Sequence, residues 1–109
     1  MPPQPHHPVD LLPHHLQEVL QILARHVPNI EVRAFGSRVK GTAKPYSDLD
    51  LALMTTQPLP LAQEAALKEA FDEASLPFKV DVLDWASTAP AFRQLIAQDG
   101  VCLRAASAP

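Results

Sequence analysis

The sequence has a single cysteine, no long apolar run and no excess of positive charge. Cys102 has no second cysteine with which to form an internal disulfide, which favours a reducing, cytoplasmic setting. No apolar stretch approaches the ~20 residues that a membrane-spanning helix needs. The N-terminus lacks both the basic and the apolar segment of a secretory signal. The formal net charge of -3 argues against a protein that binds nucleic acid through its overall charge.

The remaining composition is that of one globular domain. Of 109 residues, 47% are hydrophobic and 19% are charged, which is typical of a soluble protein with a single core. The first eight residues, MPPQPHHP, include four prolines. They predict an extended tail over residues 1–9, whose histidines have no fixed geometry for a metal. A folded domain is expected over residues 10–104, followed by a frayed C-terminus over residues 105–109.

Hydrophobic periodicity predicts helices that alternate with strands. Apolar residues spaced by three and four predict three helices, which run from Asp10 to Pro28, from Pro60 to Pro77 and from about Ser87 to Gly100. The last helix is expected to carry Phe92, Leu95 and Ile96 inward. Strands are predicted at IEVRAF, DLDLALM and KVDVLDW, with VCLR as a short edge strand and a helical turn at the start of SRVKGTAKPYS. This order predicts an α/β (α+β) fold, in which a small mixed sheet is covered by helices.

Two aspartates share one face of the predicted strand DLDLALM. Asp48 and Asp50 alternate with leucines that face the core, and their backbone positions lie roughly 6.5–7 Å apart. Aspartate is depleted in strands, so this pair needs a compensating partner. Carboxylates at this spacing can share two divalent cations ~3.5–4 Å apart, an arrangement suited to in-line phosphoryl displacement. Hard carboxylate oxygens favour Mg²⁺, so the pair predicts a two-metal magnesium site.

A third carboxylate is expected from the strand KVDVLDW. Asp81 lies in the middle of this strand, on the face opposite Val80 and Val82, and is preferred for that reason. Asp84, near the end of the same strand, is the competing candidate. Either aspartate could instead cap a turn.

Gly36 and Ser37 follow the strand IEVRAF, where the chain is expected to turn into a helix. Glycine lets the backbone approach a ligand closely, and the N–H groups of the next turn, with the Ser37 hydroxyl, can hold a phosphate. Arg38 follows directly, and four of the nine basic residues lie in this region, which suits a triphosphate. Gly36 and Gly41 have the spacing of a P-loop, but Thr42 stands where that motif requires lysine, so the P-loop is rejected.

Gly36-Ser37, ten intervening residues and Asp48-Leu49-Asp50 together resemble the signature of the DNA polymerase β-like nucleotidyltransferase superfamily. The longer segment GSRVKGTAKPYSDLDLAL, followed by VDVLDW, is similar to the minimal nucleotidyltransferase (MNT) family. The resemblance implies the polymerase β-like nucleotidyltransferase fold. It also implies an enzyme that moves a nucleoside monophosphate from an NTP to a hydroxyl and releases pyrophosphate.

The same resemblance implies a role for each site residue. It gives the catalytic, metal-binding role to three carboxylates: Asp48, Asp50 and Asp81. The first two would hold both magnesium ions, and the third would complete the ion that activates the acceptor. Binding of the β- and γ-phosphates would fall to the Gly36 backbone, Ser37 and Arg38.

The resemblance further implies a partner. Members of the MNT family are paired with a small helical HEPN-domain toxin, and the MNT protein acts as antitoxin by transferring AMP from ATP to a tyrosine of the toxin. The chain length agrees with this, because little sequence remains to build a site for a large acceptor, which must be held in near-attack geometry. A partner protein would then bring its own hydroxyl. The motif itself does not select the base of the NTP or an oligomeric state, so a homo-oligomer stays open.

Two other functions are compatible with the same sequence. The first is a non-catalytic antitoxin that neutralises a toxin by covering it. Retention of three acidic side chains argues against pure sequestration, because an idle site has no reason to keep charges that are costly to bury. The second is a nucleotidyltransferase that acts on a small molecule, such as an aminoglycoside, or on nucleic acid with a partner subunit. No basic face supports nucleic acid as a direct ligand.

Overall fold

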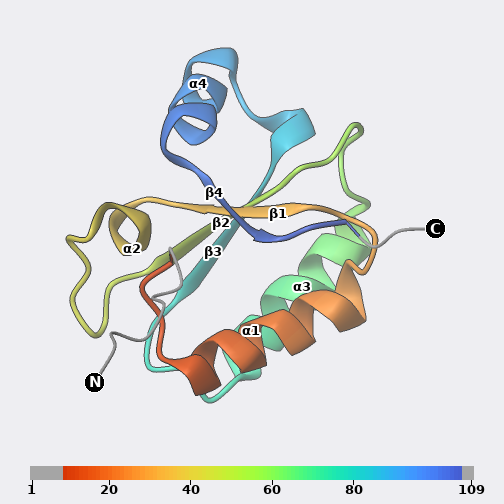
Figure 1. The fold of residues 1–109 in the computed structure, drawn as a ribbon. Helices are drawn as coiled ribbons and strands as arrows, with labels where there is room; N and C mark the ends of the chain where they lie inside the picture. Colours follow the sequence, from red (N-terminus) through yellow and green to blue (C-terminus); the bar gives the residue numbers. More distant parts are fainter. Residues whose placement is uncertain (1–8, 107–109) are drawn as a thin grey trace.

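A four-stranded mixed sheet forms the centre of the computed structural model, which describes residues 9–106 (Figure 1). Its strands are β1 (Val32–Phe35), β2 (Leu49–Leu53), β3 (Val80–Asp84) and β4 (Val101–Arg104). They stand in the order β3-β2-β1-β4. β1 is antiparallel to both β2 and β4, whereas β2 and β3 are parallel. The predicted mixed sheet and its C-terminal edge strand are confirmed.

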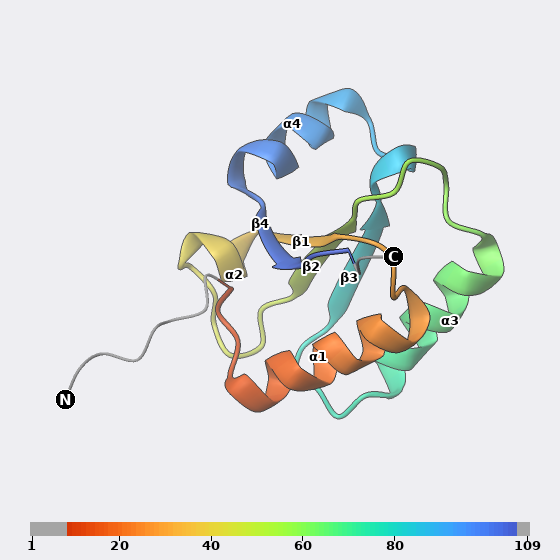
Figure 2. The same ribbon diagram turned by 45° about the vertical axis from the view of Figure 1, so that its right-hand side comes forward.

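Helices cover the two faces of this sheet unequally. The helical elements are α1 (Pro13–His26), α2 (Ser37–Lys40), α3 (Leu61–Glu73), the 3₁₀ turn η1 (Trp85–Ser87) and α4 (Pro90–Asp99). α1 and α3 pack together on one face, and α4 lies on the other (Figure 1 and Figure 2). α2 is the helical turn that was expected after β1. Between residues 9 and 106, no helix combines the length and the apolar character needed to cross a membrane.

The core lies between the sheet and the layer of α1 and α3. Leu49, Leu51 and Leu53 alternate along β2 and are fully buried, as a period of two predicts. They pack with the buried residues of the two helices, which are Val19 and Leu23 from α1 and Leu67 and Phe71 from α3. Because successive side chains of a strand point to opposite faces, burial of these leucines places Asp50 on the face that carries α4.

The start of the folded domain differs from the prediction by a few residues. α1 begins at Pro13 rather than at Asp10, because Leu12 has extended backbone (φ -64, ψ 147) and acts as the N-cap. Proline is favoured at the first helical position. Val9, which was assigned to the tail, is 1% exposed and belongs to the core. The rest of the predicted tail and the last residues of the predicted frayed end lie outside the described residues.

α4 covers its face of the sheet less completely than predicted. Ile96 is buried, but Phe92 and Leu95 are 41% and 54% exposed, so the prediction that all three face inward is wrong. The helix begins only at Pro90, after η1. The Phe92 ring meets Phe35 edge-on, with 5.8 Å between the ring centroids. A lone helix on a sheet face buries the residue that points straight at the strands and leaves the flanks of its apolar stripe in solvent.

Candidate active site

Three aspartates lie on one face of the sheet where β2 and β3 begin. Asp50 and Asp81 are register partners in the parallel pair, and Phe35 is the partner of Asp50 on β1. Register partners project from the same face of a sheet. Asp48 stands just before β2 and two residues from Asp50, so it belongs to the same face. Tertiary structure thus brings together the three carboxylates that the sequence analysis selected.

The electrostatics of Asp50 reflect this arrangement. Burial raises the pKa of Asp50 above its usual value, and the negative charges of Asp81 and then of Asp48 raise it further. Asp48 is exposed, and the Asp81 carboxylate forms an ion pair with Lys79, with 3.6 Å between Nζ and Oδ1. The three negative charges therefore destabilise one another, and a cation between them would relieve the repulsion.

This donor set fits Mg²⁺. Within the described part of the chain, the side chains as they stand do not close around one point as a group of three or more His, Cys, Asp or Glu ligands. Mg²⁺ does not require such a cage, because it binds through one or two carboxylates together with waters and substrate phosphates. Hard oxygen donors and mutual repulsion at Asp50 are the properties that such a site needs.

Gly36 connects the two halves of the motif. It has φ 81 and ψ -156, a conformation that is essentially restricted to glycine, and it is the N-cap of α2. A Cβ atom at this position would collide with Oδ2 of Asp50. Glycine is therefore required both by the backbone and by the close approach of the turn to the carboxylate. Ser37 follows as the first residue of α2.

Arg38 does not lie where a phosphate contact would require it. Its side chain is buried, and its guanidinium donates hydrogen bonds to the carbonyl oxygens of Asp10, Lys44, Pro45 and Ser47. It also stacks over the ring of Phe78, 4.3 Å from the centroid. The expected phosphate contact would break this arrangement. No local sequence pattern predicts the contacts with Asp10 and Phe78, because both residues are far from Arg38 in the sequence.

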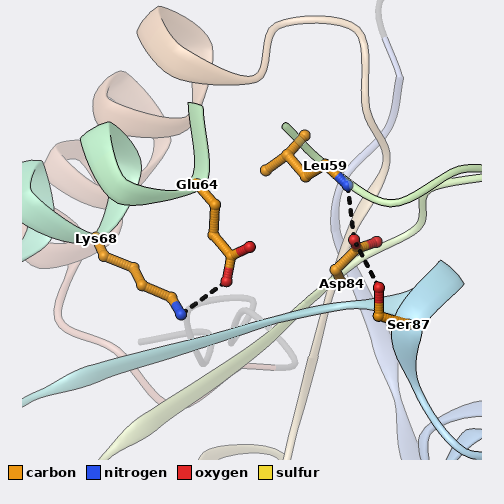
Figure 3. Close-up of polar contacts among 5 residues, drawn as sticks. All are labelled: Leu59, Glu64, Lys68, Asp84 and Ser87. Carbon is orange, nitrogen blue, oxygen red and sulfur yellow. Dashed lines mark hydrogen bonds and ion pairs between the residues drawn. The ribbon is translucent and has the colours of Figure 1, made fainter. Parts of the chain in front are cut away.

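Asp84, the competing third carboxylate, has a different role. It pairs with Leu53 at the far end of the two strands, three positions from the pair of Asp50 and Asp81. Its carboxylate accepts hydrogen bonds from the Leu59 amide at 2.7 Å and the Ser87 hydroxyl at 3.3 Å (Figure 3), and also from the Thr55 hydroxyl. The Ala86 amide donates as well, at 3.2 Å.

These hydrogen bonds determine the charge state of Asp84. Burial by itself raises its pKa, but the hydrogen bonds from Thr55, Leu59, Ala86 and Ser87 outweigh burial and lower the pKa below its usual value. Asp84 therefore ties the loop after β2 to η1. The nearby ion pair of Glu64 and Lys68 (Figure 3) lies within α3, with 2.8 Å between Oε1 and Nζ.

Comparison with known families gives a match over most of the chain. Residues 17–108 match the family model described as Polymerase beta, Nucleotidyltransferase. The chain is 51% identical over 88 residues to a Haemophilus influenzae (strain Rd) protein named Probable protein adenylyltransferase MntA. That alignment covers 81% of this chain and 77% of the Haemophilus protein.

Two solved complexes contain a chain of similar fold. The first is a toxin–antitoxin with AMP-PNP, with a TM-score of 0.70 and 22% identity over 84% of this chain and 74% of that chain. The second is a tri-AMPylated Shewanella oneidensis HEPN toxin in complex with an MNT antitoxin, with a TM-score of 0.63 and 21% identity over 84% of this chain and 71% of that chain. At this level of identity the likeness concerns the fold, and it confirms the predicted sheet and helices.

Proposed function

Because the chain belongs to the polymerase β nucleotidyltransferase family, we propose that it transfers AMP from ATP to a tyrosine hydroxyl of a HEPN-type toxin and so acts as its antitoxin. One observation carries the proposal most of all. Asp50 and Asp81 are register partners, with Asp48 on the same face, and the glycine turn of Gly36 touches Asp50. The name of the Haemophilus relative, a protein adenylyltransferase, supports AMPylation of a protein.

The three carboxylates would hold Mg²⁺ in the roles that the motif implies. Asp48 and Asp50 would bind both ions, and Asp81 would complete the one next to the acceptor. When bound, the ions neutralise the phosphates and polarise the reacting oxygens. The raised pKa of Asp50 belongs to the protein without metal, because a bound cation favours the charged carboxylate.

The glycine turn would position the nucleotide. The open backbone at Gly36, which lies against Asp50, and the hydroxyl of the following Ser37 would contact the β- and γ-phosphates. The acceptor oxygen then attacks the α-phosphorus, a P–O bond forms, and the bond to the β-phosphate breaks so that pyrophosphate leaves. The proton of the acceptor hydroxyl passes to water on the Asp81 side of the site as the new bond forms. Asp48 is exposed, so a hydroxyl on another protein can reach this edge of the sheet.

We place the protein in the cytoplasm, where ATP and Mg²⁺ are present. Cys102 is exposed and unpaired among the described residues, and a free thiol at the surface suits a reducing compartment.

A transfer assay tests the proposal. The purified protein is incubated with a HEPN-domain toxin, Mg²⁺ and each NTP in turn, and the intact mass of both proteins is measured. The toxin should gain the mass of one or more AMP groups with the wild type and not with Asp48→Asn. Asp72→Asn, an exposed aspartate on α3, is the matched control and should retain transfer.

Two results would contradict the proposal. If the wild type silences the toxin as a stable complex without any added mass, the protein is a sequestering antitoxin. If mass appears on a small molecule or a nucleic acid but not on the toxin, the enzyme class is right and the acceptor is wrong.

A further inference from the structure

Arg38 is held almost entirely by main-chain oxygens. It is 6% exposed, and its guanidinium, which has five N–H donors, forms four hydrogen bonds. Nε donates to Ser47 O at 2.9 Å and Nη1 to Asp10 O at 2.8 Å. Nη2 donates to Pro45 O at 3.0 Å and to Lys44 O at 3.4 Å. In the described range 9–106, no carboxylate forms an ion pair with it, so carbonyl dipoles compensate its charge.

Three of these acceptors belong to the turn that leads into β2. Within this turn, the Lys44 amide donates to Ser47 Oγ at 2.8 Å, and the Ser47 amide donates to Lys44 O at 3.0 Å. Ser47 directly precedes Asp48. The guanidinium therefore determines where the chain enters β2 and where the first carboxylate stands.

The other side of the guanidinium contacts the segment that leads into β3. Its Cζ lies 4.3 Å from the centroid of the Phe78 ring, and Phe78 is 8% exposed. Phe78 stands three residues before Asp81. The two segments are also joined directly, because the Leu49 amide donates to Lys79 O at 2.9 Å. One side chain thus contacts both segments that carry the carboxylates.

Arg38 is also joined to the phosphate side of the motif. It follows Ser37 in α2, and its own carbonyl accepts a hydrogen bond from the Asp10 amide at 2.7 Å. The segment before α1 is therefore held to α2 from two directions. A planar guanidinium can donate in several directions at once, whereas a lysine ammonium is a compact point charge that cannot span the same acceptors.

We propose that Arg38 is a positioning residue that sets the spacing between the Asp48 segment, the Asp81 segment and the Gly36–Ser37 turn. It acts through these segments and does not touch the nucleotide. This inference rests on the proposed function, since it assigns Arg38 a role in nucleotide transfer. A positioning role and a phosphate contact differ in the effect they predict for a lysine substitution. Lysine keeps the positive charge but lacks the planar guanidinium with its several hydrogen-bond donors.

Arg38→Lys tests the proposal in two independent measurements. In the transfer assay, we expect kcat to fall about 10–100-fold, as for a small misplacement of reacting groups, with KM for ATP within about twofold. In the nucleotide-free protein, amide hydrogen exchange should rise in peptides that cover 44–50 and 77–82 and stay unchanged in α1 and α3. Arg25→Lys, on an exposed position of α1, is the matched control and should change neither measurement.

The outcomes separate this inference from the proposed function. Unchanged exchange in 44–50 and 77–82 would overturn it, and so would a higher KM for ATP with unchanged kcat, which would indicate a phosphate contact. If Arg38→Lys loosens the whole protein, Phe78→Leu gives a second test, because it removes the ring and keeps the guanidinium. It should raise exchange in the same two segments, and unchanged exchange there would overturn the inference. Exchange is measured without substrate, so it tests the positioning even if the wild type transfers no AMP.

Discussion

Gly36→Ala should both destabilise the protein and stop nucleotide transfer. Alanine at φ 81 and ψ -156 is strained by about 1–3 kcal/mol, because that region is essentially restricted to glycine. Alanine also lowers the conformational entropy of the unfolded chain relative to glycine, which offsets about 0.4–1 kcal/mol of this cost. The new methyl would also collide with Oδ2 of Asp50, so the carboxylate or the turn must move. A displaced Asp50 can no longer act with Asp48 and Asp81.

Gly41→Ala is the matched control for this prediction. Gly41 has φ 78 and ψ 17, and nothing lies within 4 Å of an added Cβ. Its substitution carries only the left-handed backbone cost of about 1–2 kcal/mol, with the same offset from the unfolded chain. We therefore expect Gly36→Ala to be less stable than Gly41→Ala, because the two backbone costs are similar in size and only Gly36→Ala adds the collision with Asp50.

Thermal unfolding and the transfer assay measure the two parts of the prediction. A difference of 1 kcal/mol corresponds to about 4–8 °C in Tm for a domain of this size. Gly36→Ala should thus melt below Gly41→Ala, and only the latter should retain transfer. Equal melting temperatures, or full activity in Gly36→Ala, would show that the contact between Gly36 and Asp50 has no part in the site.

Two further predictions concern the aspartates. Asp50→Asn should raise Tm at neutral pH without Mg²⁺ while it abolishes transfer. The pKa of Asp50 in the folded protein is raised above 3.8, so stability is lost as the pH rises from 3.8 through the folded pKa. The gain in Tm from asparagine should therefore vanish near pH 3, where the carboxyl is protonated in both states. An Asp50→Asn variant that melts lower than the wild type at pH 7 would contradict this. Asp84→Asn should lower the free energy of unfolding by roughly 1–2 kcal/mol through weakened hydrogen bonds and leave kcat unchanged. Asp81→Asn should instead reduce kcat at a near-normal Tm. The reverse pattern would make Asp84 the third carboxylate.

Local patterns were sufficient for most of the fold. Alternation along DLDLALM predicted that three leucines face the core and that Asp50 faces the opposite side, and both are observed. The helical spacing of apolar residues also predicted helices where α1 and α3 are observed. These signals are readable because the side-chain direction in a strand or a helix repeats within a few residues.

The structure departs from the sequence-based expectation where burial depends on distant partners. Phe92 and Leu95 fall on an apolar stripe, yet they are exposed because the helix covers only part of the sheet. Arg38 stands in a basic segment, which suggested a phosphate ligand. Its acceptors come from Asp10 and from the turn before β2, and its ring partner Phe78 is 40 residues away.

The sequence alone determined the motif, the order of the elements and the face on which Asp48 and Asp50 stand, because each of these depends on neighbours along the chain. Only the tertiary structure placed Asp81, and not Asp84, opposite Asp50, since that placement depends on the register of β2 against β3. It also determined the contacts of Arg38, which involve segments that meet only after folding. Side-chain periodicity is a local property of the backbone, whereas register and burial are set by contacts between residues that are remote in sequence.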